Sequence, residues 1–104
     1  MIITTSDFIP NHEISNILGI ARGSTVRARN VAKDFFAAFK NIIGGEIEEY
    51  TYLQAQAREQ ALQRMLKDAE NLGADAVINV RFTTAMIMQG ASEMLVYGTA
   101  VKLK

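Results

Sequence analysis

The chain has 104 residues, 49% of them hydrophobic, and its 11 basic and 11 acidic side chains give a net charge of zero. That length predicts a single domain over residues 1–104, and the neutral balance argues against nucleic acid or an anionic membrane surface as a partner. The chain has no cysteine, which excludes disulfides, thiolate catalysis and thiolate metal sites, and without a basic leader or a run of about 20 apolar residues we expect a cytoplasmic protein.

The amino-terminal part of the chain predicts two strands. The β-branched run from Ile2 to Thr5 indicates a short strand, and the polar residues and proline from Ser6 to Asn11 indicate a loop. A long extended segment follows from Ile14 to Arg29. Gly19 and Gly23 interrupt this segment, and a glycine inside a strand is typical of a bulge, a bend or a close backbone approach.

The middle of the chain predicts two helices. Asn30 is suited to cap the first helix, which we expect from Val31 to Ile43 because apolar residues recur there at helical spacing, and Gly44-Gly45 ends it. The second helix runs from Glu46 or Glu48 to Leu72, with Gly73 as its stop. Its apolar stripe comprises Leu53, Ala57, Ala61, Met65, Ala69 and Leu72.

The last third of the chain predicts two more strands, joined by a turn. From Ala76 to Thr83 apolar residues alternate with polar ones, which is typical of a strand with one buried face, and Gln89 to Ser92 form the turn. The segment from Glu93 to Leu103 is apolar on both faces, with Leu95, Tyr97, Val101 and Leu103 on one and Met94, Val96, Gly98 and Ala100 on the other. A strand buried on both sides needs two covering layers.

These elements predict an α+β fold in the order β-β-α-α-β-β. Its sheet is mainly antiparallel, with two helices packed on one face. Helices on one face leave the other face open, yet the terminal strand is apolar on that side as well, and the chain holds more hydrophobic residues than one small core requires. We therefore expect another subunit to cover the open face, so that the protein is a homo-oligomer.

Charge is distributed unevenly along the chain. From Arg22 to Lys40, five basic residues against one acid give a net charge of +4. From Glu46 to Glu70, three basic residues against six acids give −3. Two solvated faces explain this pattern, and so does a complementary contact between subunits.

Candidate metal ligands are few. His12 is the only histidine, and it lies in a predicted loop, so a tetrahedral zinc site lacks its usual ligands. The thioethers of Met86, Met88 and Met94 suit Cu(I), since the first two share one face of a strand and we expect the third across the hairpin. Packing is the other explanation, because methionine commonly fills irregular apolar gaps.

Candidate ligand-binding residues lie on the second helix and on the strand that follows it. Gly44-Gly45-Glu46 offers backbone N–H groups at a helix start, which suit an anion, although a helix–helix turn also explains the glycines. Tyr50 and Arg58 lie on the same helix, where Arg58 either pairs with an acid or binds an anion. Asn79 and Arg81 project from one face of a central strand, and they are the best candidates if that face lines an interface or a channel. One loop histidine builds no catalytic triad.

Several runs resemble the YbjQ-like family of small bacterial and archaeal proteins. They are Gly44 to Thr51, Ala57 to Glu59 with Arg64-Met65, Leu72 to Ile78, Val80 to Phe82, Arg27 to Asn30, and Tyr97 to Val101. The match covers nearly the whole chain. The resemblance implies an α+β subunit in a ring-shaped homopentamer and a label as a heavy-metal-binding domain, with no catalytic residues to carry over.

The resulting prediction is a homo-oligomer, a pentamer by the resemblance, that binds a small ligand or a metal ion at its subunit interfaces. Two alternatives stay open. One is an enzyme whose site is shared by two subunits and uses Glu46, Tyr50 and Arg58, and the other is a structural or partner-binding ring with no ligand. The sequence identifies no cofactor and no reaction.

Overall fold

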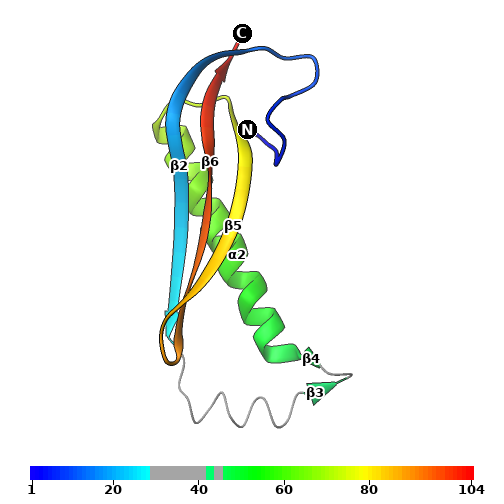
Figure 1. Ribbon diagram of the computed structural model, residues 1–104, viewed down its shortest axis with the longest axis vertical. Helices are drawn as coiled ribbons and strands as arrows, with labels where there is room; N and C mark the ends of the chain where they lie inside the picture. Colours follow the sequence, from blue (N-terminus) through cyan, green and yellow to red (C-terminus); the bar gives the residue numbers. More distant parts are fainter. Residues whose placement is uncertain (29–41, 44–45) are drawn as a thin grey trace.

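The computed structural model of the chain describes residues 1–28, 42–43 and 46–104. Four strands form a mixed sheet in the order β1-β5-β6-β2, namely β1 (Ile2–Ile3), β5 (Ala76–Met88), β6 (Ala91–Leu103) and β2 (Ile14–Ala28). β5, β6 and β2 are antiparallel neighbours, and β1 adds to β5 in parallel. Helix α2 (Glu48–Asn71) lies across one face of this sheet (Figure 1). The predicted α+β class with a mainly antiparallel sheet is confirmed.

The helical layer differs from the prediction. The described residues contain one helix, α2, instead of two, and it corresponds to the second predicted helix. Most of the predicted helix from Val31 to Ile43, its cap Asn30 and the Gly44-Gly45 turn lie outside the described residues. The last two residues of that helix form strand β3 (Ile42–Ile43), which pairs with β4 (Glu46–Ile47). The predicted helix boundaries are wrong at these positions, because β-branched isoleucines favour an extended backbone.

Helix α2 packs on the sheet through small side chains. Ala57, Ala61, Met65 and Ala69 of the predicted stripe are buried against β2 and β6. Leu72 lies beyond the helix end and is 39% exposed, so it does not extend the stripe. A Cβ on Gly23 would overlap the backbone nitrogen of Met65 and the backbone oxygen of Ala61. Of the three alternatives predicted for the glycines of this strand, Gly23 shows the close backbone approach.

Helix α2 also covers the free edge of β2, the outer strand of the sheet. The Asp68 carboxylate accepts a hydrogen bond from the backbone N–H of Arg22 (3.0 Å), and Arg64 Nη1 donates to the backbone oxygen of Ser24 (2.6 Å). Nearer the amino end of β2 the register shifts at Ile14/Asn16 and at Ile17/Gly19. Bulges and covered backbone groups both prevent another strand from pairing with an edge, so the β2 edge is protected.

A bulge in β5 changes which side chains face the helix. Ile78 pairs with Thr99, whereas the next pair on the same face joins Arg81 to Tyr97, so β5 contains one extra residue here. Asn79 adopts a left-handed conformation (φ 54°), which asparagine tolerates better than most residues. The predicted alternation from Ala76 to Thr83 is therefore wrong after Ile78, because Ile78 packs on the open face and Val80 on the helix face.

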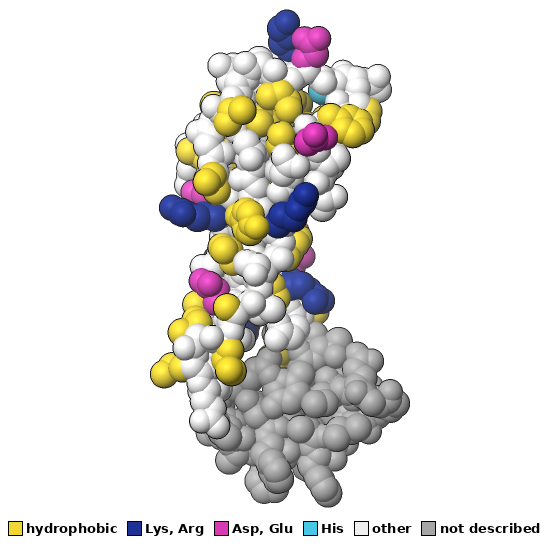
Figure 2. All heavy atoms as spheres, viewed as in Figure 1, with side chains coloured by type: hydrophobic (Ala, Val, Ile, Leu, Met, Phe, Trp, Pro, Cys, Tyr) yellow, Lys and Arg dark blue, Asp and Glu magenta, His cyan; other side chains and the backbone are white. Residues whose placement is uncertain are grey.

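The second face of the sheet has no helix over it among the described residues. At one end, Ile9 covers a small apolar cluster of Ala76, Ile78 and Val101. Further along, Ile17, Ile20 and Val26 of β2 are each more than half exposed. Hydrophobic side chains lie exposed over the strands in Figure 2. The open apolar face predicted from the last strand is present, and we call it the open face.

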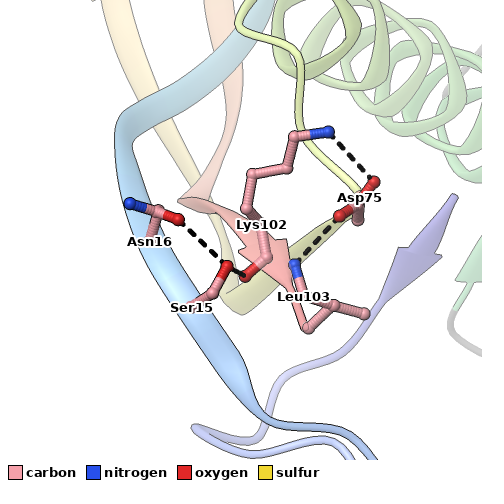
Figure 3. Close-up of polar contacts among 5 residues, drawn as sticks. All are labelled: Ser15, Asn16, Asp75, Lys102 and Leu103. Carbon is pink, nitrogen blue, oxygen red and sulfur yellow. Dashed lines mark hydrogen bonds and ion pairs between the residues drawn. The ribbon is translucent and has the colours of Figure 1, made fainter.

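The end of the sheet away from the β5–β6 hairpin is held by Asp75 (Figure 3). Its backbone N–H donates to the Val101 oxygen (2.9 Å), and its Oδ2 accepts from the Leu103 N–H (2.9 Å). Its Oδ1 lies 3.4 Å from Lys102 Nζ. The Leu103 hydrogen bond, with a smaller contribution from Lys102, lowers the pKa of Asp75 below its ordinary value, although desolvation opposes the shift.

This lowered pKa makes the stability of the fold depend on pH. A carboxyl group with a lower pKa in the folded state stabilises the fold above its unfolded pKa of about 3.9, and that stabilisation is lost as the pH falls through the folded value. We expect Asp75→Asn to reduce the free energy of unfolding at pH 7, and the difference from wild type to shrink below about pH 4. Urea unfolding at a series of pH values measures both.

Lys102→Met is the matched control for this effect. It removes the ion pair but leaves the Leu103 hydrogen bond, which is the larger cause of the shift, so it should keep most of the pH dependence. If the free energies of unfolding of Asp75→Asn and wild type differ by the same amount at pH 3 and at pH 7, the expected link between Asp75 ionisation and stability is contradicted.

Candidate functional site

A hollow of about 330 Å³ opens on the open face of the sheet. Three neighbouring strands form it, and its lining residues are Ile20 of β2, Asn79 and Arg81 of β5, and Tyr97, Gly98 and Thr99 of β6. Two of the candidate ligand-binding residues, Asn79 and Arg81, therefore lie together here. The hollow combines an apolar wall with an amide, a guanidinium and hydroxyl groups.

The β5 bulge and the amino-terminal segment position the polar residues of the hollow. The backbone N–H of Asn79 donates to the Ser6 oxygen (3.0 Å). Arg81 Nη1 donates to the backbone oxygens of Thr5 and Val80, both at 2.9 Å. These two bonds hold the guanidinium in place. Both use Nη1, and since a guanidinium has five N–H donors, those of Nη2 and Nε take no part in them.

Tyr97 lies between two arginines in one cross-strand row. It pairs with Arg22 on β2 and with Arg81 on β5, so all three side chains belong to the open face. Adjacent strands are about 4.8 Å apart, which puts the two arginine Cα atoms about 10 Å apart. The two ion pairs found among the described residues, Lys102–Asp75 and Lys104–Glu13, include neither arginine. The row is thus a local concentration of positive charge on the open face.

Arg58 lies elsewhere in the molecule. It lines a different hollow, of about 350 Å³, between α2 and β5, together with Ala55, Glu59, Leu62 and Phe82. This hollow is on the helix side of the sheet, so the structure does not bring Arg58 to Asn79 and Arg81. Glu46 lies in β4 and Tyr50 in the first turn of α2, and their side chains are outside the described part of the chain.

Comparison with known families places this chain among relatives of the same size. The family model described as "Putative heavy-metal-binding" matches residues 1–104, the whole chain. The chain belongs to the YbjQ family. The resemblance seen in the sequence is confirmed.

Full-length relatives support the assignment to the YbjQ family. Proteins printed as "UPF0145 protein" from Archaeoglobus fulgidus and Thermosipho africanus are 58% and 53% identical, and each comparison covers 100% of this chain and 96% of the relative. A third, from Methanosarcina acetivorans, is 52% identical over 99% of this chain and 97% of the relative. A crystal structure of a DUF74 family protein from Pediococcus pentosaceus has a TM-score of 0.65 at 18% identity, covering 100% of this chain and 98% of that chain. That likeness concerns the fold alone.

The candidate metal ligands do not converge on one site in this YbjQ family member. Met86 and Met88 are exposed near the β5–β6 hairpin, whereas Met94 is 7% exposed, pairs with Thr84 and packs in the core under α2. His12 lies in the loop before β2, at the end of the sheet where β5 begins. About 12 residues of strand, or roughly 40 Å, separate the beginning of β5 from the β5–β6 hairpin. The described residues hold no group of three or more His, Cys, Asp or Glu side chains suited to a metal ion. They also include no helix with the length and apolar content to cross a membrane.

The sequence pattern predicts only part of the open-face site. It identifies Arg22 only as one charge in a basic segment, and Tyr97 only as part of an apolar strand face. Arg22 and Tyr97 are neighbours because the register of β2 with β6 pairs them, although they are 75 residues apart in the chain. The bulge at Asn79 could be predicted from the sequence, because an asparagine inside a strand is compatible with a left-handed bulge position.

Proposed function

We propose that this YbjQ family protein is a non-enzymatic homo-oligomer, a pentameric ring as the family resemblance implies, that binds a small anionic ligand at its open face near a junction between copies. The observation that carries the proposal is the row of Arg22, Tyr97 and Arg81 beside the hollow on an exposed apolar face.

The exposure of the open face supports assembly. Ile17 is 73% exposed, and Ile20 and Val26 on the same strand are also largely exposed. Exposed apolar residues gathered on one face of a sheet are consistent with an interaction site. A second copy over this face would remove the apolar surface from water and enclose the hollow, which now opens to solvent.

The chemistry of the hollow supports an anion that carries an apolar group. Guanidinium groups recognise carboxylate and phosphate through parallel hydrogen bonds, and Arg81 is held in place by backbone oxygens. Thr99 and Asn79 add neutral hydrogen-bonding groups, while Ile20 and the face of Tyr97 offer apolar surface. Glu93, a half-buried acid on the same face, lies four residues from Tyr97 on β6, about 13 Å away.

Native mass spectrometry of protein purified without chelator or affinity metal tests both parts of the proposal. One spectrum reports the number of subunits and any bound mass. An oligomer that carries an organic anion supports the proposal. A monomer contradicts the assembly, and an oligomer that gains mass only after divalent metals or Cu(I) are added contradicts the anionic ligand in favour of the family's metal label.

Arginine substitutions test the site directly. With phenyl phosphate as the probe, we expect Arg81→Gln and Arg22→Gln each to weaken binding about tenfold or more, because a hydrogen bond to a charged group contributes about 1.5–3 kcal/mol. Inorganic phosphate should bind more weakly than phenyl phosphate because it lacks the apolar group. Titration calorimetry measures both. Arg58→Gln, on the helix side of the sheet, is the matched control, and an equal loss for Arg58→Gln contradicts the assignment.

A further inference from the structure

The end of the β5–β6 hairpin exposes an uncharged apolar segment. All residues from Phe82 to Gln89 are exposed and none is charged. Met86 is 79% exposed, and Ile87 and Met88 are each more than half exposed. Soluble proteins usually protect such strands with charges, bulges or covering elements. β6 pairs with one edge of this segment, but in the described sheet no strand pairs with its outer edge, because β1 pairs only with Ala76 and Val77. We call Met86, Ile87 and Met88 the tip.

A second exposed apolar feature lies on the helix side of the same chain. The hollow of about 350 Å³ between α2 and β5 adjoins another of about 210 Å³, and both are lined by Leu62 and Phe82. The smaller hollow is almost entirely apolar and extends to Ile3 and Val80. α2 packs on β2 and β6, and no other element among residues 1–28, 42–43 and 46–104 covers this strip beside β5. We call the two joined hollows the groove.

The tip of one chain cannot fill the groove of the same chain. Phe82 and Met86 are four residues apart on one extended strand, a separation of about 13 Å. α2 crosses the sheet at an angle, so that its first turns and the β5–β6 hairpin lie apart (Figure 1). Each molecule therefore carries an exposed apolar tip and an apolar groove that cannot contact each other within one chain.

The tip and the groove are both largely apolar, and they lie at different places on the same chain. The uncharged tip matches the apolar walls of the groove at Leu62, Val80 and Phe82. Arg58 and Glu59 also line the larger hollow, and both are exposed. The flexible thioethers of methionine adapt to irregular apolar hollows and contact aromatic rings favourably. A head-to-tail contact between two different patches generates a closed ring when its rotation closes.

From these features we infer that the tip of one copy binds the groove of the next copy, and that this contact joins the subunits. The inference rests on the proposed homo-oligomer and names its contact. The β2 edge is excluded as the receiving surface along its middle, because Asp68 and Arg64 of α2 already bind its backbone.

Complementation between two single variants tests the contact. Met86→Asp places a charge on the tip, and Phe82→Asp places one in the groove; each should weaken association about 100-fold, because it buries an unpaired charge. In an equimolar mixture, the intact tip of Phe82→Asp should bind the intact groove of Met86→Asp, and analytical ultracentrifugation should show heterodimers but no larger species. Met86→Leu should assemble like wild type.

Two further variants make the test robust. Ala55→Glu places a charge in the groove from an exposed helix position. It replaces Phe82→Asp if circular dichroism shows that Phe82→Asp does not fold. Thr83→Asp lies on the same strand but faces the open side, so it charges the open face and leaves the groove intact. If Thr83→Asp fails to assemble while Met86→Asp assembles, the open face and not the tip joins the subunits.

Each remaining outcome decides the inference. Assembly of Met86→Asp at the wild-type level overturns the contact but leaves the proposed oligomer intact. Two monomeric variants that stay monomeric when mixed also overturn it, because head-to-tail patches must complement one another. A wild-type protein that is monomeric overturns the contact and the proposed oligomer together and leaves the groove to a partner of different sequence.

Discussion

Gly23→Ala is expected to destabilise the protein by about 3 kcal/mol or more, a large share of the 5–15 kcal/mol that holds a domain together. The added methyl group would overlap the backbone nitrogen of Met65 and the backbone oxygen of Ala61. Backbone atoms in the middle of a helix have no rotamer to change, so α2 would have to move away from β2. That movement would also strain the bonds from Asp68 and Arg64 to the β2 edge.

Urea unfolding at fixed protein concentration measures this effect, because association alters apparent stability. Ser24→Ala is the matched control, since it changes the next residue, whose backbone oxygen and not its hydroxyl accepts the bond from Arg64. Its effect should stay within about 0.5 kcal/mol. Equal midpoints for Gly23→Ala and Ser24→Ala would show that α2 does not approach β2 this closely.

Met65→Ala should cost about 2–5 kcal/mol of stability. Met65 is fully buried and is among the largest side chains with no exposure. The buried residues beside it on the helix, Ala61 and Ala69, are small, and Leu62 and Leu66 are only partly buried against this core, so filling the space would require those leucines to shift. The loss therefore combines the removed apolar contact with the cavity that remains.

Met65→Leu and Lys67→Ala separate the cavity effect from changes in the helix itself. Met65→Leu keeps most of the volume and should cost less than about 1.5 kcal/mol. Lys67→Ala, at an exposed position two residues along α2, should change stability by no more than about 0.5 kcal/mol. If Met65→Ala and Lys67→Ala unfold at the same urea concentration, Met65 does not lie in the core as described.

Local patterns in the sequence were enough to predict several elements. The second helix was predicted to end at Leu72 and ends at Asn71, and Gly73 adopts the left-handed conformation (φ 80°) that stops it. The long strand from Ile14 and the strand to Leu103 were also predicted close to their observed bounds. Helical and strand periodicity depend on residues a few positions apart, so one sequence is sufficient to reveal them.

The prediction for β5 failed where the partner strand decides the structure. The alternation from Ala76 to Thr83 assumed an unbroken strand, but after Ile78 the bulge at Asn79 moves Val80 to the helix face and Arg81 to the open face. The same limit applies to Met94, which was considered as a metal ligand and lies in the core. A one-residue change in pairing moves every following side chain to the other face.

The amino-acid pattern is sufficient to predict the α+β class, the apolar surplus on the last strand and the presence of Asn79 and Arg81 on a central strand. The three-dimensional arrangement is needed to show that Tyr97 lies between Arg22 and Arg81, and that the groove and the tip are separate features of one chain. The physical reason is that periodicity identifies a face within one element, whereas a site on a sheet depends on the register between strands that are distant in the chain.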